Sequence, residues 1–183
     1  KATETTLILD IPAEKKFSES VSLKVLASGH FNKYKFKDSS NSLTNNLFQL
    51  APELVFYSDN FIFHAGGTPS WNNNDVTILP NIYGEAQLQQ NVISIQAGWV
   101  GRYLPNSFRT LSGENPYMND PAILNNTKEV QFYGGIKATL DKHFNFSAKA
   151  AVITYHDLPL FVNSPVDPKS FLVVNESKLD NFQ

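Results

Sequence analysis

The four histidines are the residues of this sequence best suited to proton transfer or metal binding. They are His30, His64, His143 and His156, and each stands alone, without the second histidine or the carboxylate at short spacing that a metal site requires. We therefore expect them in surface, lumen or interfacial positions. We expect neither a metal nor another cofactor.

The neighbours His156 and Asp157 have the residue types of a catalytic dyad but lack a nucleophile. The chain contains no cysteine, and the sequence places no serine beside this pair. The pairs Gly66-Gly67 and Gly134-Gly135 lack the spacing and the following helix of a phosphate-binding loop. The sequence predicts no enzyme activity.

Most of the chain alternates apolar and polar residues with a period of two, which is the pattern of a half-buried β-strand. From Val76 to Leu88 the apolar residues fall on even numbers, and from Ile93 to Tyr103 they fall on odd numbers. Similar runs begin near Leu7, Val21, Phe48, Phe61, Val130 and Phe144. We predict an all-β chain folded as an antiparallel meander of about nine strands.

The change of parity between these two runs indicates a tight hairpin, because directly opposed residues of an antiparallel pair share a face. Constant pairing sums predict the opposed pairs Leu88–Ile93, Ala86–Ile95, Gly84–Ala97, Ile82–Trp99, Leu140–Phe144 and Phe56–Phe61. Two prolines, Pro52 and Pro80, fall inside predicted strands, where we expect β-bulges.

The connections alternate between two kinds. We expect short turns near Pro12–Ser18, Ser58–Asn60, Gln89–Asn91, Asp141–His143 and Glu176–Asn181. We expect long links at Lys37–Asn45, Thr68–Asp75, Pro105–Lys128 and His156–Ser170. Short turns at one end of a meander and long loops at the other are the layout of an outer-membrane β-barrel.

The apolar face is better suited to lipid than to a soluble core. Its strands run to roughly 11–13 residues, near the ~9–11 tilted residues that cross a bilayer, and the face of the clearest strands is uncharged and rich in alanine and glycine. Small residues would fill a close-packed core poorly. Aromatic residues fall toward both strand ends, as in interfacial girdles: Phe48, Trp99, Tyr103 and Phe132 at the loops, and Phe56, Phe61, Phe144 and Phe146 at the turns.

The polar face would then line the barrel interior. The lumen-facing candidates are Glu53, Tyr83, Glu85, Gln87, Gln96, Arg102, Glu129, Gln131, Tyr133, Lys137 and Lys149. Their mixed charges suggest a hydrogen-bonded, charge-paired wall, which either stabilises the barrel or forms a selective passage.

The alternative is a soluble all-β binding module of carbohydrate-binding type, with Trp71, Trp99 and Tyr103 as stacking surfaces. The two hypotheses differ in where four side chains point. In a barrel they point outward from a curved sheet, whereas in a module they pack between two sheets: Ile82, Ile95, Trp99 and Ile136.

Composition excludes some functions. The 183 residues have a net charge of -2 and a pI near 6.1, so they offer no basic face for nucleic acid. No apolar stretch approaches the ~18 residues of a transmembrane helix. We expect residues 1–183 to form a single β-barrel segment without a separate plug domain.

The stretches GWVGRYLPNSFRTLSGENPYM (98–118) and YGGIKATLDKHFNFSAKAAVITYHDLPLFVN (133–163) carry a family resemblance. They resemble the barrel part of TonB-dependent-receptor-like outer-membrane proteins of the Bacteroidota. The resemblance implies a bacterial outer-membrane location and a role in solute passage or as a component of an envelope complex. The implied partners are membrane lipid, an unknown small-molecule solute, and envelope proteins or a surface lipoprotein. No TonB box is recognisable, and an odd number of strands leads us to expect a segment of a larger barrel.

Overall fold

The computed structural model describes residues 3–36, 41–89, 92–141 and 144–183, which are almost entirely β-strand. One short helix, α1 (Phe108–Glu114), lies in the connection between the sixth and seventh strands. The strands are β1 (Thr3–Lys16), β2 (Val21–Lys35), β3 (Ser42–Tyr57), β4 (Phe61–Asn72), β5 (Asp75–Gln89), β6 (Ile93–Leu104), β7 (Thr127–Asp141), β8 (Phe144–His156), β9 (Leu158–Asn163), β10 (Phe171–Glu176) and β11 (Leu179–Phe182).

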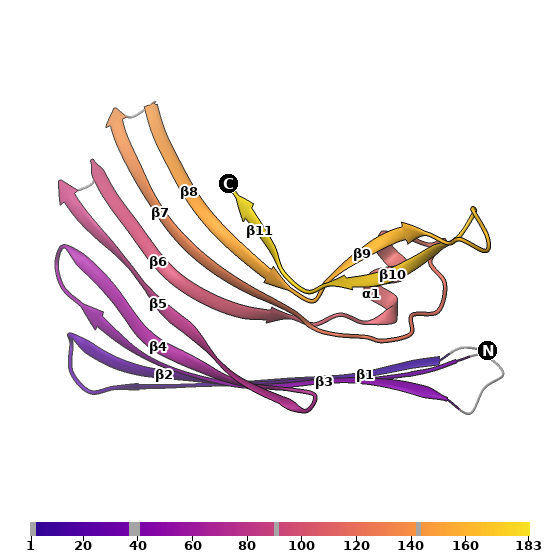
Figure 1. Cartoon of the computed structure of the whole chain (residues 1–183). Helices are drawn as coiled ribbons and strands as arrows, with labels where there is room; N and C mark the ends of the chain where they lie inside the picture. The colour runs from indigo at the N-terminus through magenta and orange to yellow at the C-terminus, as the bar shows by residue number, and fades with distance from the viewer. Residues whose placement is uncertain (1–2, 37–40, 90–91, 142–143) are drawn as a thin grey trace.

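Nine strands form one curved antiparallel sheet in the order β1-β2-β3-β4-β5-β6-β7-β8-β11, with β1 and β11 at its edges (Figure 1). The remaining two strands, β9 and β10, form a separate hairpin between β8 and β11. This arrangement confirms the predicted all-β meander.

The four side chains that distinguish a barrel from a binding module lie exposed on this sheet and are not packed between two sheets. Their exposed fractions are 39% for Ile82, 42% for Ile95, 50% for Trp99 and 37% for Ile136. The described strands therefore do not favour the sandwich arrangement that a soluble binding module requires.

The pairing predicted for the β5–β6 hairpin is confirmed over most of its length. Ala86 lies opposite Ile95, Gly84 opposite Ala97, and Ile82 opposite Trp99. Near the turn the register shifts between Gln87 and Gln89, so that Gln89 rather than Leu88 opposes Ile93. An extra residue of this kind bends a strand and increases its twist as it enters a turn.

Two other predicted pairs are wrong by small displacements. A register shift between Thr139 and Asp141 places Asp141, not Leu140, opposite Phe144. In the β3–β4 hairpin, Phe56 lies opposite Phe63 rather than Phe61. The second error keeps the same face continuous, because its displacement is two residues.

The expected bulges at Pro52 and Pro80 are absent from the described strands. The β3–β4 pairing instead lapses between Gln49 and Glu53 and resumes in the same register. Pairing of β5 with β6 stops at Asn81–Val100, just before Pro80. Because proline has no N–H to donate, the ladder is interrupted rather than displaced.

The loop end differs from the prediction in four places. The expected link Lys37–Asn45 overlaps β3, which begins at Ser42, and the expected link His156–Ser170 contains β9. Thr68–Asp75 is not a long link, since β4 and β5 are joined by Asn73 and Asn74 alone, with Asn73 at a φ of 53°. Asparagine tolerates this left-handed conformation better than most residues. The predicted turn at Glu176–Asn181 is wrong from Leu179 onward, where β11 begins.

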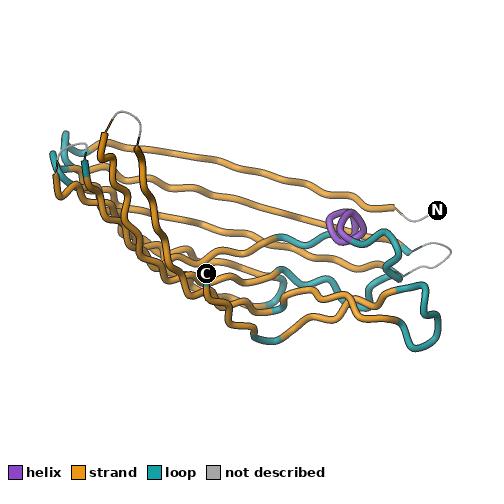
Figure 2. The backbone as a smooth tube through the Cα atoms, turned by 90° about the horizontal axis from the view of Figure 1, so that it is seen from above, coloured by secondary structure: helices purple, strands orange, loops and turns teal. Residues whose placement is uncertain are grey.

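The two long connections fold into a compact unit, which we call the cap: residues 105–126 with α1, together with the β9–β10 hairpin. Met118 forms an isolated parallel bridge with Phe171, which joins the two parts. Leu111, Met118 and Leu124 of the cap are buried in one cluster with Tyr34 of β2. Viewed from above, α1 lies near the N-terminal end of β1 (Figure 2). The cap therefore links one side of the curved sheet, where β6, β7 and β8 lie, to the opposite side, where β1 and β2 lie.

Candidate lumen wall and membrane-facing surface

The strand register divides the sheet into two faces. The outer face contains the even positions of β3, β5, β7 and β8 and the odd positions of β1, β2, β4 and β6. The opposite positions form the inner face. All eleven predicted lumen-facing residues fall on the inner face, and their role as a lumen lining remains a prediction.

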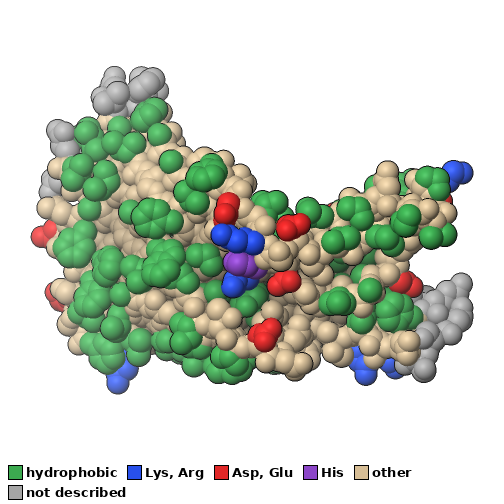
Figure 3. Space-filling model, viewed as in Figure 1, with side chains coloured by type: hydrophobic (Ala, Val, Ile, Leu, Met, Phe, Trp, Pro, Cys, Tyr) green, Lys and Arg blue, Asp and Glu red, His purple; other side chains and the backbone are tan. Residues whose placement is uncertain are grey.

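The outer face exposes a large continuous apolar surface. Hydrophobic side chains gather over the turn-side half of the sheet in Figure 3, and a small group of charged and histidine side chains lies where that half ends. Soluble monomers rarely expose apolar patches beyond a few hundred Å². The exposed members include Leu9, Ile11, Leu54, Phe63, Ile78, Ile82, Ile95, Phe132, Phe146 and Val152.

The aromatic positions of this face agree in part with the predicted girdles. On the loop side, Phe48, Trp99 and Phe132 are 41%, 50% and 64% exposed. Tyr103 is not part of the girdle, because it is buried with Leu47 and Leu79. The cause is the separation of β5 from β6 beyond Val100, which lets the end of β6 pack on Leu79. On the turn side, Phe61 and Phe146 are exposed, and the side chain of Phe144 lies outside the described residues.

Several charged side chains on the inner face contact one another or an aromatic ring. Arg102 Nε donates to Glu129 Oε1 at 2.8 Å, and Lys137 Nζ lies 3.4 Å from Glu85 Oε2. The ammonium of Lys149 lies 4.2 Å from the ring centre of Tyr133, as in a cation–π contact. These pairs give the inner face the charge-paired character that the sequence predicted.

Glu53 is the centre of a polar cluster on this face. Its carboxylate lies 2.7 Å from His64 Nδ1 and accepts a hydrogen bond from Asn81 Nδ2 at 2.8 Å. The Tyr83 hydroxyl donates to the same carboxylate at 3.4 Å and its ring stacks on His64 with centroids 4.1 Å apart. His64 is thus not isolated, contrary to our expectation. The sequence signal for this pair was the alternation that places Glu53 of β3 and His64 of β4 on the same face.

The three glutamines among the candidates, Gln87, Gln96 and Gln131, lie on the same face. Gln96 packs against Gly135, since a Cβ at Gly135 would lie 3.0 Å from Gln96 Nε2. The glycine therefore makes room for a polar side chain on the neighbouring strand.

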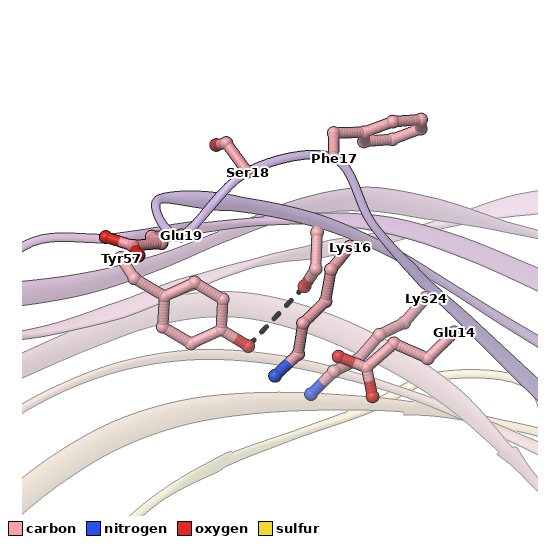
Figure 4. Close-up of a pocket in the computed structure, with 8 residues that line it drawn as sticks. Glu14, Lys16, Phe17, Ser18, Glu19, Lys24 and Tyr57 are labelled. Atoms are coloured by element: carbon pink, nitrogen blue, oxygen red, sulfur yellow. Dashed lines mark hydrogen bonds between the residues drawn. The ribbon is translucent and has the colours of Figure 1, made fainter.

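A hollow of about 780 Å³ opens on the inner face beside the β1–β2 turn. The side chains of Glu14, Lys16 and Lys24 converge beneath the turn, while Phe17 points away from them (Figure 4). Tyr57 forms one side of the hollow and makes a long hydrogen bond of 3.5 Å with Ser22. Both signs of charge line it, so it offers no preference for an anion or a cation.

A network of asparagines joins the strand ends beneath the cap. Asn126 is 1% exposed, accepts from Asn45 Nδ2 at 2.8 Å and donates to Asn72 Oδ1 at 2.7 Å. Asn106 donates its backbone N–H to Asn126 and its side-chain amide to Thr127. The sequence analysis missed this network, although the chain contains 19 asparagines and several stand at predicted strand ends.

Tyr34, at the loop end of β2 and on its inner face, anchors the cap. Tyr34 stacks on Phe108 with ring centres 4.4 Å apart and donates its hydroxyl hydrogen to Asp120 Oδ1 at 2.7 Å. Burial and the hydrogen bond to Asp120 raise the pKa of Tyr34 to about 12.

The remaining sequence candidates form no joint site. His156 Nδ1 contacts the Ser177 carbonyl and Asp157 accepts from Asn125, so the two side chains are directed to different partners. Trp71 packs on Phe48 rather than beside Trp99. His30 lies on the inner face of β2, and His143 lies outside the described residues.

The described part of the chain contains no group of three or more histidine, cysteine or acidic side chains that could hold a metal ion. None of its helices is long and apolar enough to cross a membrane.

No protein-family model and no curated protein matches the sequence. Among solved structures, the chain is similar to the pyoverdine outer membrane receptor FpvA from Pseudomonas aeruginosa PAO1 bound to pyoverdine, at 14% identity and a TM-score of 0.47, over 99% of this chain and 32% of the other. It is also similar to FpvAI in complex with pyocin S2, at 13% identity and a TM-score of 0.45, over 98% of this chain and 29% of the other. A ferripyoverdine-bound receptor from the Pseudomonas aeruginosa outer membrane matches at 14% identity and a TM-score of 0.46, over 98% and 28%. The chain spans about a third of the length of these structures or less.

Proposed function

We propose that the chain forms part of the wall of a bacterial outer-membrane β-barrel of the TonB-dependent-receptor-like type. Its outer face contacts lipid and its inner face lines the barrel interior. The observation that carries this proposal is the uncharged, exposed apolar band on one face of a single curved sheet. Between Val130 and Ala138 on β7, and between Val21 and Phe31 on β2, no outer-face residue bears a charge.

The height of this band supports a membrane-spanning role. From Val130 to Ala138 the outer face of β7 extends over eight residue steps, which is roughly 27 Å along a strand. Strands tilted by about 40° would cover roughly 21 Å along the membrane normal, which is close to the ~25 Å apolar band of an outer-membrane barrel.

The inner face favours a receptor-like interior over an open pore. The cap packs on Tyr34 from the inner side of β2, and the charges below it are paired with one another. A permanently open channel requires a free aqueous path, whereas this arrangement covers the loop end. Solute passage would then require the cap to move.

Several finer assignments belong to this proposal. They are transport of a small solute, assembly with an envelope protein or surface lipoprotein, a single barrel segment over residues 1–183 without a separate plug domain, and the Bacteroidota lineage. We infer no catalytic role.

Membrane fractionation of cells that express the chain tests the proposal. We expect the chain in the outer-membrane fraction, extractable only with detergent, and migrating differently on gels before and after boiling because folded barrels resist denaturation. A chain that stays in the aqueous phase without detergent, in a folded all-β state, would contradict the proposal.

A further inference from the structure

The charged residues of the outer face gather at its loop-side rim. The charged side chains on this face of the described strands are Lys15, Lys33, Lys35, Lys128 and Asp180. Only Lys15 lies at the turn end, where its ammonium is 5.7 Å from the Phe17 ring centre. The loop-side rim therefore has an excess of positive charge.

The rim residues on distant strands lie at one level. Lys33 follows the first residue of β2, Val21, by twelve positions, and His156 follows the first residue of β8, Phe144, by twelve. Lys128 of β7 lies directly opposite His156. Since β2 and β8 both begin at a short turn on the same end of the sheet, Lys33 and His156 lie the same number of residues from the turns.

A local cluster contains Lys128 of β7, His156 of β8 and Lys178, which directly precedes β11. His156 Nδ1 contacts the carbonyl of Ser177, the residue before Lys178. Lys178 Nζ lies 3.4 Å from Asp180 Oδ2, and both side chains are about half exposed. Asp180 also accepts from the Thr154 hydroxyl at 2.7 Å. Lys178 therefore pairs with Asp180, His156 lies two residues from Thr154 on the same face as Asp180, and Lys128 lies directly opposite His156.

The order of residues below this cluster is that of a lipid interface. Four positions from Lys128 toward the turns stands Phe132, 64% exposed, with Trp99 directly opposite it. Beyond them the face is aliphatic, with Ile95 and Ile136. From the loop end toward the turns, this face presents basic side chains, then aromatic rings, then aliphatic side chains. This order corresponds to the headgroup phosphates, the interfacial layer and the acyl chains of a bilayer.

We propose that Lys128, His156 and Lys178 form a binding site for the phosphate of an anionic lipid headgroup on the outer surface of the barrel. We choose an anionic lipid as the occupant for two reasons. The basic side chains are complementary in charge to a phosphate, and the site is continuous with the apolar band, which would contact the acyl chains. The inference rests on the proposed membrane function, because the site requires acyl chains to lie against Phe132 and Trp99.

Lipid retention in native mass spectrometry tests the site. The full chain is inserted into vesicles of equal parts phosphatidylcholine and phosphatidylglycerol, extracted gently, and its bound lipids are identified. We expect phosphatidylglycerol to be enriched several-fold over phosphatidylcholine. Lysines near an anionic surface each contribute roughly fivefold in affinity, so Lys128→Gln with Lys178→Gln should abolish the enrichment.

The matched control removes the same charge elsewhere. Lys16 lies on the inner face at the turn end and Lys169 in the connection between β9 and β10. Lys16→Gln with Lys169→Gln should retain the wild-type enrichment. The site is refuted if wild type shows no enrichment, or if the Lys128 and Lys178 double variant keeps it.

Two further measurements separate the possible failures. Flotation with pure phosphatidylcholine vesicles reports insertion alone, so a chain that floats but retains no anionic lipid refutes the site and leaves the barrel proposal standing. A chain that never floats refutes both. Inorganic phosphate added to the phosphatidylcholine vesicles should bind no tighter to wild type than to the double variant; tighter binding would refute a lipid-specific site.

Discussion

Glu4 and Phe108 are joined by a hydrogen bond across 104 positions of sequence, with the Glu4 carboxylate accepting the Phe108 backbone N–H at 2.8 Å. The same carboxylate accepts from the N–H of Arg109 at 2.9 Å and from Asn32 Nδ2 at 2.9 Å. A side chain of β1 thus satisfies donors at the first turn of α1 that have no partner within the helix. This contact fixes the cap to the far side of the sheet.

Substituting Glu4→Gln should loosen the cap without unfolding the sheet. Glutamine keeps one acceptor oxygen but presents an amide donor to the second N–H, so we expect a local loss of about 1 kcal/mol. Hydrogen exchange at the Phe108 and Arg109 amides should accelerate, while amides in β5 and β6 keep their rates. Glu14→Gln, on the same face of β1 at the turn end, is the control. Equal exchange rates in both variants would show that Glu4 does not hold the cap.

The Tyr34 hydroxyl should titrate at a higher pH than that of an ordinary tyrosine, whose pKa is near 10. Because the folded-state pKa is raised to about 12, the protonated hydroxyl stabilises the cap fully below about pH 10, and this contribution disappears as the pH rises through about 12. The absorbance difference at 295 nm between wild type and Tyr34→Phe should follow a titration centred near pH 12. A difference curve centred near pH 10 would mean that the bond to Asp120 does not form.

Asn126 should be the least replaceable member of the asparagine network. Asn126→Ala leaves Asn45, Asn106 and Asn72 each short of a hydrogen bond in a buried site, which should cost about 2–4 kcal/mol. Urea unfolding of the refolded chain measures the change. Asn74→Ala, in the exposed β4–β5 turn, should change stability by less than about 0.5 kcal/mol. Similar midpoints for the two variants would argue against a structural role for the network.

The sheet could be predicted from the sequence because its alternation is local information. A strand with one apolar face fixes which residues share that face, so Ile82–Trp99 and Ala86–Ile95 follow once a tight turn is placed between them. Residues next to the turns were predicted less well. The shifts at Gln87/Gln89 and Thr139/Asp141 depend on twist near the turn, which leaves no mark on the hydrophobic period.

The inner-face residues were predictable as a group but not as pairs. Parity alone places Arg102 and Glu129 on one face, but the contact between them depends on the register of β6 against β7. The cap was not predictable from alternation, because its contacts join Glu4 and Tyr34 to a connection some hundred positions away. Such non-local contacts have no periodic signal.

Gly66 should tolerate no side chain. A Cβ at this position would lie 2.4 Å from the Pro52 carbonyl oxygen, and backbone cannot move aside as a flexible side chain can. Gly66→Ala should therefore destabilise the sheet by about 1–3 kcal/mol, seen as an earlier urea midpoint. Gly134→Ala is the matched control on the outer face of β7, since no atom lies within 4 Å of its added Cβ. Equal midpoints would show that β3 and β4 are farther apart at Pro52 than described.

The neighbours Ile95 and Gln96 test which face of the sheet meets lipid, because they are adjacent on β6 and lie on opposite faces. Ile95→Lys places an ammonium near the middle of the apolar band and should reduce folding into vesicles by roughly 2–4 kcal/mol. Gln96→Lys places the same charge on the polar inner face and should fold nearly as well as wild type. The measurement is the folded fraction recovered in vesicles across a urea series. If Gln96→Lys were the damaging change, the inner and outer faces would be assigned in reverse; if both variants folded equally, neither face would contact lipid.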